Sequence, residues 1–115
     1  MHEYGLTKRI VTIVNETARA HGATRVTAVF LVVGENTGII PDSVQMYYDM
    51  IAQDTPASGA TLHVRSVKAQ MYCAGCGQNF QRPLFSFACP RCGELGSPTD
   101  IGNECYVESV EIDDG

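Results

Sequence analysis

The stretch that decides the fold runs from Cys73 to Cys92 and contains Cys73-Ala74-Gly75-Cys76-Gly77 and Cys89-Pro90-Arg91-Cys92-Gly93. Each half is a Cys-x-x-Cys pair, a spacing that lets both thiolates reach one metal ion from a single tight turn. The glycine after each pair can take a positive φ, so the turn can curl until backbone N–H groups face the sulfurs. The spacing therefore predicts one tetrahedral zinc ion bound by Cys73, Cys76, Cys89 and Cys92.

Three other uses of these cysteines compete with zinc. Two disulfides suit a secreted protein, and a redox Cys-x-x-Cys pair usually sits at the start of a βαβ helix, which this loop-rich stretch does not resemble. Iron in a rubredoxin-like electron carrier stays open, because the same cysteine spacing suits both metals. A closed four-thiolate site has no free coordination position, so we expect a structural ion and no catalysis at it.

Composition describes an ordinary globular protein. The 115 residues are 44% hydrophobic and 18% charged, which fits one domain with an appended metal module. The formal net charge of −5 argues against nucleic acid as the main partner. We see no signal peptide and no apolar run long enough for a membrane span, and we therefore expect a reducing, cytoplasmic location and no membrane partner. The fifth cysteine, Cys105, is expected to be a small buried hydrophobe.

Two amphipathic helices and three strands are predicted outside the cysteine stretch. The first helix ends near Gly22, and the second begins at Pro41, where proline and the following acid suit a first turn. Strands are predicted over 25–33, 61–69 and 105–112, the first of them turning wholly apolar toward its end. The apolar stripes of the helices are Leu6, Ile10, Ile13, Val14 and Ala18, then Val44, Tyr47, Tyr48 and Ile51.

This order of elements predicts an α+β fold. A three-stranded sheet packs with two helices, and a zinc-ribbon-like four-cysteine module is inserted between two strands of that sheet. We place the α/β domain at 1–69 plus 103–115 and the inserted zinc-binding domain at 70–102. The insertion is too short for a sizeable core of its own, so it needs the metal as a cross-link.

The N-terminal residues Met1, His2 and Glu3 offer a second kind of metal chemistry. The Met1 amine, the His2 amide nitrogen and the His2 imidazole can close adjoining chelate rings, and this nitrogen set suits square-planar nickel(II) or copper(II). Glu3 could complete the site through its amide or its carboxylate. The competing interpretation is a solvated histidine with Glu3 as a partner of the helix dipole. His21 and His63 have no companion at ligand spacing.

These pieces together resemble the HypA/HybF family of hydrogenase nickel-incorporation proteins. The resemblance covers essentially the whole chain: Met1-His2-Glu3, Gly34-Glu35, Ile40-Pro41-Asp42-Ser43, the two cysteine pairs and Gly102-Asn103-Glu104 before the last strand. One departure is visible, because Cys105 stands where the family usually has leucine. It puts the local role of that thiol in question and leaves the resemblance intact.

The resemblance implies a metallochaperone and not an enzyme. It implies that the positions matching Met1, His2 and Glu3 carry Ni2+ as cargo during maturation of the [NiFe]-hydrogenase large subunit, and that the four cysteines hold structural Zn2+. The implied partners are a nickel-insertion GTPase or related ATPase and the large-subunit precursor, and in some organisms urease maturation proteins. The alternative function from the residues alone is a zinc-ribbon regulatory or nucleic-acid-binding module, yet the loop between the cysteine pairs offers only Arg82 as a basic residue outside them.

Overall fold

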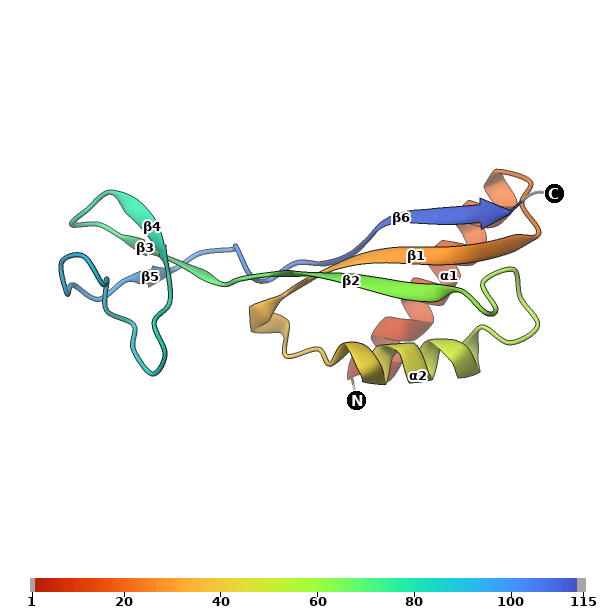
Figure 1. The fold of residues 1–115 in the computed structure, drawn as a ribbon, viewed down its shortest axis with the longest axis horizontal. Helices are drawn as coiled ribbons and strands as arrows, with labels where there is room; N and C mark the ends of the chain where they lie inside the picture. Colours follow the sequence, from red (N-terminus) through yellow and green to blue (C-terminus); the bar gives the residue numbers. More distant parts are fainter. Residues whose placement is uncertain (1, 114–115) are drawn as a thin grey trace. The chain divides into compact units, whose positions relative to one another are not determined.

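The computed structural model describes residues 2–113, apart from the side chain of His2, and divides the chain into two compact units (Figure 1). The first unit comprises residues 1–32, 39–65 and 106–115, and the second comprises 33–38 and 66–105. The elements in chain order are α1 (His2–Ala20), β1 (Arg25–Gly34), a 3-10 turn (Glu35–Thr37), α2 (Pro41–Ile51), β2 (Thr61–Val67), β3 (Gln70–Cys73), β4 (Gln78–Gln81), β5 (Ser97–Pro98) and β6 (Cys105–Asp113).

The first unit packs α1 and α2 against a three-stranded sheet of order β2-β1-β6. Its core is dominated by small β-branched side chains together with one tyrosine. Apolar burial of this kind is the main stabilising term of such a unit. The most deeply buried of these side chains are Val14, Val26, Val29, Val32, Val44 and Tyr48.

Polar contacts join the helices to the loop before β2. The Tyr48 hydroxyl donates to the Ala57 carbonyl at 2.7 Å, and the Ala57 N–H donates to Asn15 Oδ1 at 2.8 Å. Burial, followed by the nearby Asp49 carboxylate, raises the pKa of Tyr48, so the hydroxyl stays a donor. The Gln45 amide oxygen accepts from the Leu62 N–H at 3.0 Å and so links α2 to β2.

An ion pair on the sheet surface joins the two strands that flank β1. Arg65 on β2 and Glu108 on β6 form an ion pair of 3.2 Å that reaches across β1. Both side chains are about half exposed, so the pair contributes little to stability. Next to it, His63 stacks on Phe30 with ring centroids 4.8 Å apart, which gives this histidine a packing role on the sheet.

The second unit contains a small antiparallel sheet of order β4-β3-β5. The register pairs Met71 with Phe80 and Cys73 with Gln78, and it pairs Tyr72 with Ser97 on the other side. The predicted α+β fold, with two helices, a three-stranded sheet and a clustered four-cysteine module, is confirmed. The sequence did not reveal that the module would have a three-stranded sheet of its own.

The predicted strand over 61–69 is divided in the structure. β2 ends at Val67 and β3 starts at Gln70. The reason is local hydrogen bonding: the Ala69 N–H donates to Glu35 Oε1 at 2.8 Å, and the Gln70 N–H donates to the Ile101 carbonyl at 3.2 Å. Donors used in this way cannot continue the ladder of the first sheet.

Candidate metal centre

Two matching turns position the cysteines. The N–H of Gly77 donates to the Cys73 carbonyl at 2.8 Å, and the N–H of Gly93 donates to the Cys89 carbonyl at the same distance. Gly77 has φ 68° and Gly93 has φ 81°, which confirms the predicted positive φ after each pair. These are conformations that a residue with a Cβ adopts only at a cost.

The turns bring all four sulfurs together. The Sγ atoms of Cys73, Cys76, Cys89 and Cys92 all lie within 4.8 Å of one another. Two of the separations are 3.4 Å, between Cys73 and Cys92, and 4.0 Å, between Cys76 and Cys89. Zinc–sulfur bonds of about 2.3 Å imply a sulfur–sulfur edge of about 3.8 Å in a regular tetrahedron. The donor set and its spacing therefore fit one tetrahedral metal ion.

The two cysteines of the second pair differ in their pKa values. Burial raises the pKa of Cys89, but hydrogen bonds from the N–H groups of Arg91 and Cys92, and then from the neighbouring sulfurs, lower this pKa to about 7. The Arg91 N–H lies 3.4 Å from Cys89 Sγ. For Cys92 a hydrogen bond from Glu94 lowers the pKa, but the adjacent sulfurs and burial outweigh it and raise the pKa to about 12. Crowding thus opposes ionisation of all four sulfurs together, and a bound cation would offset the repulsion between the thiolates.

Arg91 supplies further positive charge beside the sulfurs. Its pKa is raised by a hydrogen bond with Cys76 and by the charge of the cysteine cluster. Its guanidinium also donates to the Asn79 carbonyl, 3.4 Å away on β4. The side chain therefore links the second cysteine pair to the small sheet.

The other predicted metal ligands lie at the start of α1. Met1 lies outside the described residues, as does the side chain of His2, so only the backbone at His2 and the whole of Glu3 can be placed. Helix α1 already includes His2, with Glu3 in its first turn. The Glu3 carboxylate accepts the Ile40 N–H at 2.7 Å, and the Thr7 hydroxyl donates to the Glu3 carbonyl.

The contact between Glu3 and Ile40 could not have been found in the sequence. Ile40 is the N-cap of α2, and a carboxylate from another helix satisfies its N–H. One oxygen of the Glu3 carboxylate is thereby engaged in the fold. Of the other histidines, His21 follows α1 with Nδ1 2.9 Å from the Thr17 carbonyl, and His63 lies on β2; neither belongs to a described cluster of metal-ligating side chains.

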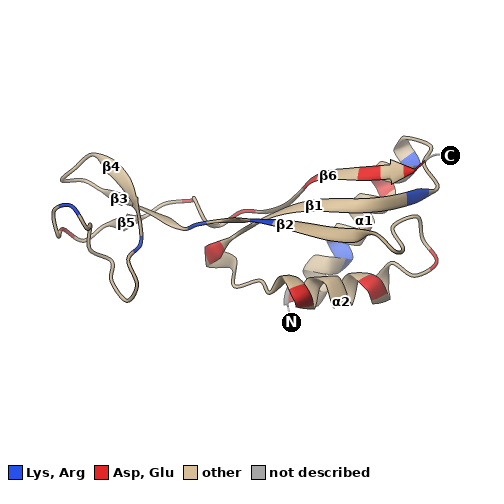
Figure 2. Ribbon diagram, in the orientation of Figure 1, with Lys and Arg blue, Asp and Glu red and all other residues tan. Residues whose placement is uncertain are grey.

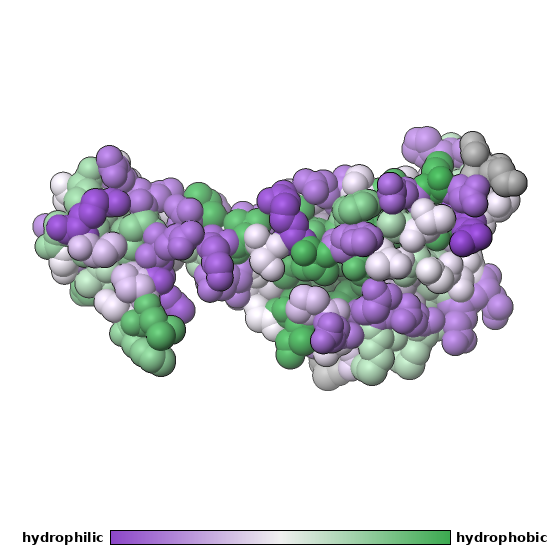
Figure 3. Space-filling view, viewed as in Figure 1, coloured by the Kyte–Doolittle hydropathy of each residue, from purple (hydrophilic) through white to green (hydrophobic). Residues whose placement is uncertain are grey.

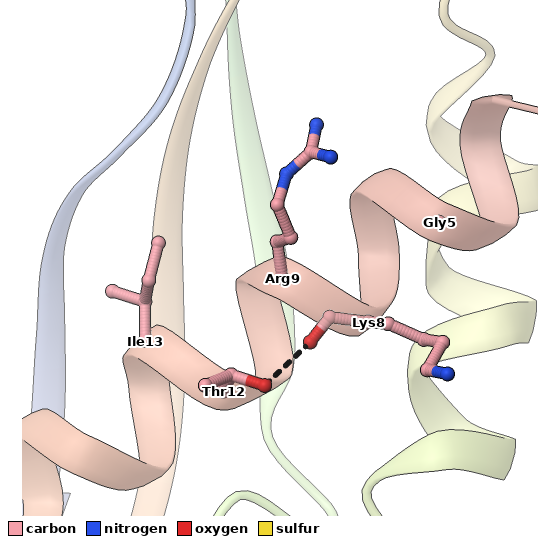
Figure 4. A pocket seen from close by; sticks show the side chains of 5 residues that line it. All are labelled: Gly5, Lys8, Arg9, Thr12 and Ile13. Carbon is pink, nitrogen blue, oxygen red and sulfur yellow. Dashed lines mark hydrogen bonds between the residues drawn. The ribbon is translucent and has the colours of Figure 1, made fainter.

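The structure has two exposed surfaces that the sequence did not predict. One is the apolar loop after β4, which forms a green projection in Figure 3. The other is a shallow groove of about 530 Å³ on α1, lined by Gly5, Lys8, Arg9, Thr12 and Ile13 (Figure 4). Within the described part of the chain, no helix is long and apolar enough to cross a membrane.

Comparison with known sequences gives matches along the whole chain. The family model described as hydrogenase/urease nickel incorporation, metallochaperone, hypA matches residues 1–112. Hydrogenase maturation factor HypA of Caldanaerobacter subterraneus subsp. tengcongensis is 41% identical over 114 residues, covering 98% of this chain and 100% of that protein. The corresponding factor of Dehalococcoides mccartyi is 34% identical, covering 99% of this chain and 96% of that protein.

Solved structures share the fold. A solution structure of a HypA protein has a TM-score of 0.72 at 21% identity, covering 100% of this chain and 98% of that chain. The solution structure of the nickel metallochaperone HypA from Helicobacter pylori has a TM-score of 0.63 at 19% identity, covering 96% of each chain. At these identities the likeness concerns the fold alone.

Proposed function

This chain belongs to the HypA family of hydrogenase/urease nickel-incorporation metallochaperones, and from that membership we propose that it binds nickel(II) at Met1, His2 and Glu3 and delivers it during [NiFe]-hydrogenase maturation. The observation that carries the proposal is the family match, which starts at residue 1 and so includes the chelating tripeptide. The relatives are maturation factors, and a carrier with no catalytic role is the function that fits them.

The position of His2 and Glu3 at the start of α1 supports nitrogen coordination. The first four N–H groups of an α-helix have no intrahelical acceptor, so a metal ion can replace the amide protons of His2 and Glu3, which pass to water, with no helical hydrogen bond lost. The positive end of the helix dipole also favours the resulting anionic nitrogens. Because the Glu3 carboxylate is held by Ile40, we assign the amide nitrogen of Glu3 to nickel and its carboxylate to anchoring the site.

A site made from one short segment suits a carrier. Incoming donors can approach the ion from the open side and replace the ligands one at a time, so the fold need not open for the cargo to leave. The cysteine site has the opposite character, because two of its sulfurs are buried and all four close around one position.

We assign zinc to Cys73, Cys76, Cys89 and Cys92, in a structural role. When bound, the ion supplies the cross-link that the small second unit requires. The chemistry of free thiolates suits a reducing compartment, and we place the protein in the cytoplasm. We further propose that the two predicted domains have different tasks. The domain formed by 1–69 plus 103–115 carries nickel, and the domain 70–102 contacts the partner.

The partners in this proposal are proteins. They are the [NiFe]-hydrogenase large-subunit precursor, a nickel-insertion GTPase or related ATPase and, where urease is present, its maturation proteins. The family description names hydrogenase and urease, which supports both classes of final acceptor.

Replacing His2 tests the nickel site directly. His2→Ala removes the imidazole and breaks the chelate, so we expect stoichiometric nickel binding to disappear in calorimetry while zinc stays at one per chain. His21→Ala is the matched control, since it removes a histidine that directly follows the other end of α1. Unchanged nickel binding by His2→Ala would place the cargo elsewhere.

Blocking the amine provides a second, independent test. Two residues, Gly-Ser, added ahead of Met1 convert the amine to an amide, and we expect nickel affinity to fall at least tenfold because the chelate loses a donor. The same dipeptide added after Gly115 should leave the affinity as it is. If both extended proteins bind nickel equally well, the Met1 amine is not a ligand.

A further inference from the structure

The loop that joins the two cysteine pairs displays large apolar side chains with little of their surface covered. In this loop, residues 82–88, the exposed fractions are 84% for Leu84, 97% for Phe85 and 55% for Phe87. Single exposed apolar residues are common, but a cluster of large ones on one projection marks a contact site. Figure 3 shows the cluster as a continuous green projection.

Neither the backbone conformation nor packing within this chain explains why position 85 is a phenylalanine. The Ser86 N–H donates to the Pro83 carbonyl at 3.3 Å and closes a tight turn, with Phe85 third in the turn and its φ at 60°. A positive φ at this position strongly favours glycine. Phenylalanine is therefore unfavourable for the turn and contributes almost no burial. Its presence is explained if it contacts something outside the chain.

The loop is held in shape before any partner arrives. The Gly96 N–H donates to the Phe87 carbonyl at 2.8 Å, and the Ala88 N–H donates to Ser86 Oγ at 3.0 Å. The Arg82 guanidinium lies 5.3 Å from the centre of the Phe87 ring, a cation–π contact that orients both side chains. A preformed loop loses less conformational entropy on binding than a mobile one.

Charge around the loop indicates the character of the partner. Apart from the clustered cysteine sulfurs, the only charged residues between Lys68 and Glu94 are Arg82 and Arg91 (Figure 2). Arg91 is engaged with Cys76 and the Asn79 carbonyl, so Arg82 is the cation beside the apolar side chains. An apolar surface with a basic border is complementary to an apolar pocket bordered by carboxylates. An anionic lipid surface would be a poor match, because each nearby basic residue adds only about 1 kcal/mol of attraction and the chain as a whole is repelled.

We propose that Leu84 and Phe85 insert into an apolar pocket, bordered by carboxylates, on the protein that accepts nickel from this chain. The proposal rests on the carrier function above and adds the surface by which the acceptor is recognised. Phe87 and Arg82 form the side of the contact, with the guanidinium facing the acidic border. The zinc site then has a mechanical purpose, because it holds both ends of the loop.

Phe85→Gly separates an effect on binding from an effect on folding, because we expect it to weaken binding without destabilising the protein. Glycine suits the φ of 60°, so the melting temperature should stay the same or rise. The zinc-loaded full-length protein, fluorescently labelled, is titrated with two purified probes: the [NiFe]-hydrogenase large-subunit precursor and the nickel-insertion nucleotidase. Losing one large buried side chain should weaken binding to the acceptor about tenfold to a hundredfold.

Two further variants test whether weaker binding is specific to the loop. Ile112→Thr removes an exposed apolar side chain from β6 and should bind as the wild type does, whereas Arg82→Gln should weaken binding several-fold and reduce its dependence on salt. Nickel and zinc stoichiometry should be unchanged in Phe85→Gly, so failure of the docking proposal is distinguishable from failure of the nickel proposal.

Two binding results would overturn the docking proposal: equal binding by the wild type and Phe85→Gly, and absence of wild-type binding to both probes. A difference in oligomeric mass between the wild type and Phe85→Gly in light scattering would also overturn it, and would assign the loop to self-association. Phe85-dependent sedimentation with vesicles containing anionic lipid would assign it to membranes instead.

Discussion

Cys89→Ser is expected to unfold the second unit and leave the first unit folded. The hydrophobic core of the second unit consists of Met71, Phe80, Cys73 and Cys89, with Cys76 packed against it, so two of its four members belong to the four-sulfur cluster to which we assign zinc. Structural zinc contributes about 10–16 kcal/mol to such small modules at neutral pH. Two remaining apolar side chains cannot replace that, because each contributes at most about 3 kcal/mol on burial.

Zinc stoichiometry and amide hydrogen exchange provide the measurement. We expect Cys89→Ser to lose its zinc and the amides of β3 and β4 to exchange as in an unfolded chain, while α1 and β1 stay protected. Cys105→Ser is the control, since it removes the cysteine that lies outside the four-sulfur cluster. A Cys89→Ser protein that kept one zinc and its protected amides would show that the cluster is not the cross-link of this unit.

Gly34→Ala is expected to destabilise the protein by about 3–5 kcal/mol, since it combines overpacking with lost hydrogen bonds. A Cβ at Gly34 would lie 2.0 Å from the Gly102 carbonyl oxygen and 2.7 Å from the Asn103 nitrogen. Both are backbone atoms, which cannot move aside as a side chain can. Separation of the two segments would also break the bonds from the Gly34 N–H to the Glu104 carbonyl at 2.7 Å and from the Asn36 N–H to the Gly102 carbonyl at 2.8 Å.

Gly5→Ala is the matched control for this prediction. A Cβ there meets nothing within 4 Å, and the residue lies in α1, so the change should be neutral or stabilising by about 0.5–1 kcal/mol. Urea unfolding of the zinc-loaded proteins, followed by circular dichroism, measures both. Equal midpoints for Gly34→Ala and the wild type would mean that the two backbone segments do not approach as closely as described.

Local sequence signals predicted the elements well because each signal acts within a few residues. Pro41 marks the first residue of α2 as predicted, and Gly22, with φ 68°, ends α1 as predicted. The same holds for the turns at Gly77 and Gly93. The prediction for Cys105 was less accurate, because its side chain is half-buried and not fully buried.

Contacts between distant residues were beyond reach of the sequence. No local pattern indicates that Glu3 accepts the N–H of Ile40, or that Glu35 accepts the N–H of Ala69 and so divides the strand predicted over 61–69. In both cases a backbone donor outside the regular ladders takes as its acceptor a carboxylate that only the fold brings near. Gly34 is an example of the same kind, since only the approach of Gly102 requires a glycine there.

The stretch from Cys73 to Cys92 shows which features the sequence determines by itself and which features depend on the tertiary structure. Its cysteine spacing by itself determined that four sulfurs could meet around one ion, because tight turns are a property of the local chain. Tertiary structure decided that the loop between the pairs projects with Phe85 exposed, and that a second small sheet frames the cluster. The physical reason is that sequence specifies which groups must be buried or paired, whereas the surface left uncovered depends on how all elements pack together.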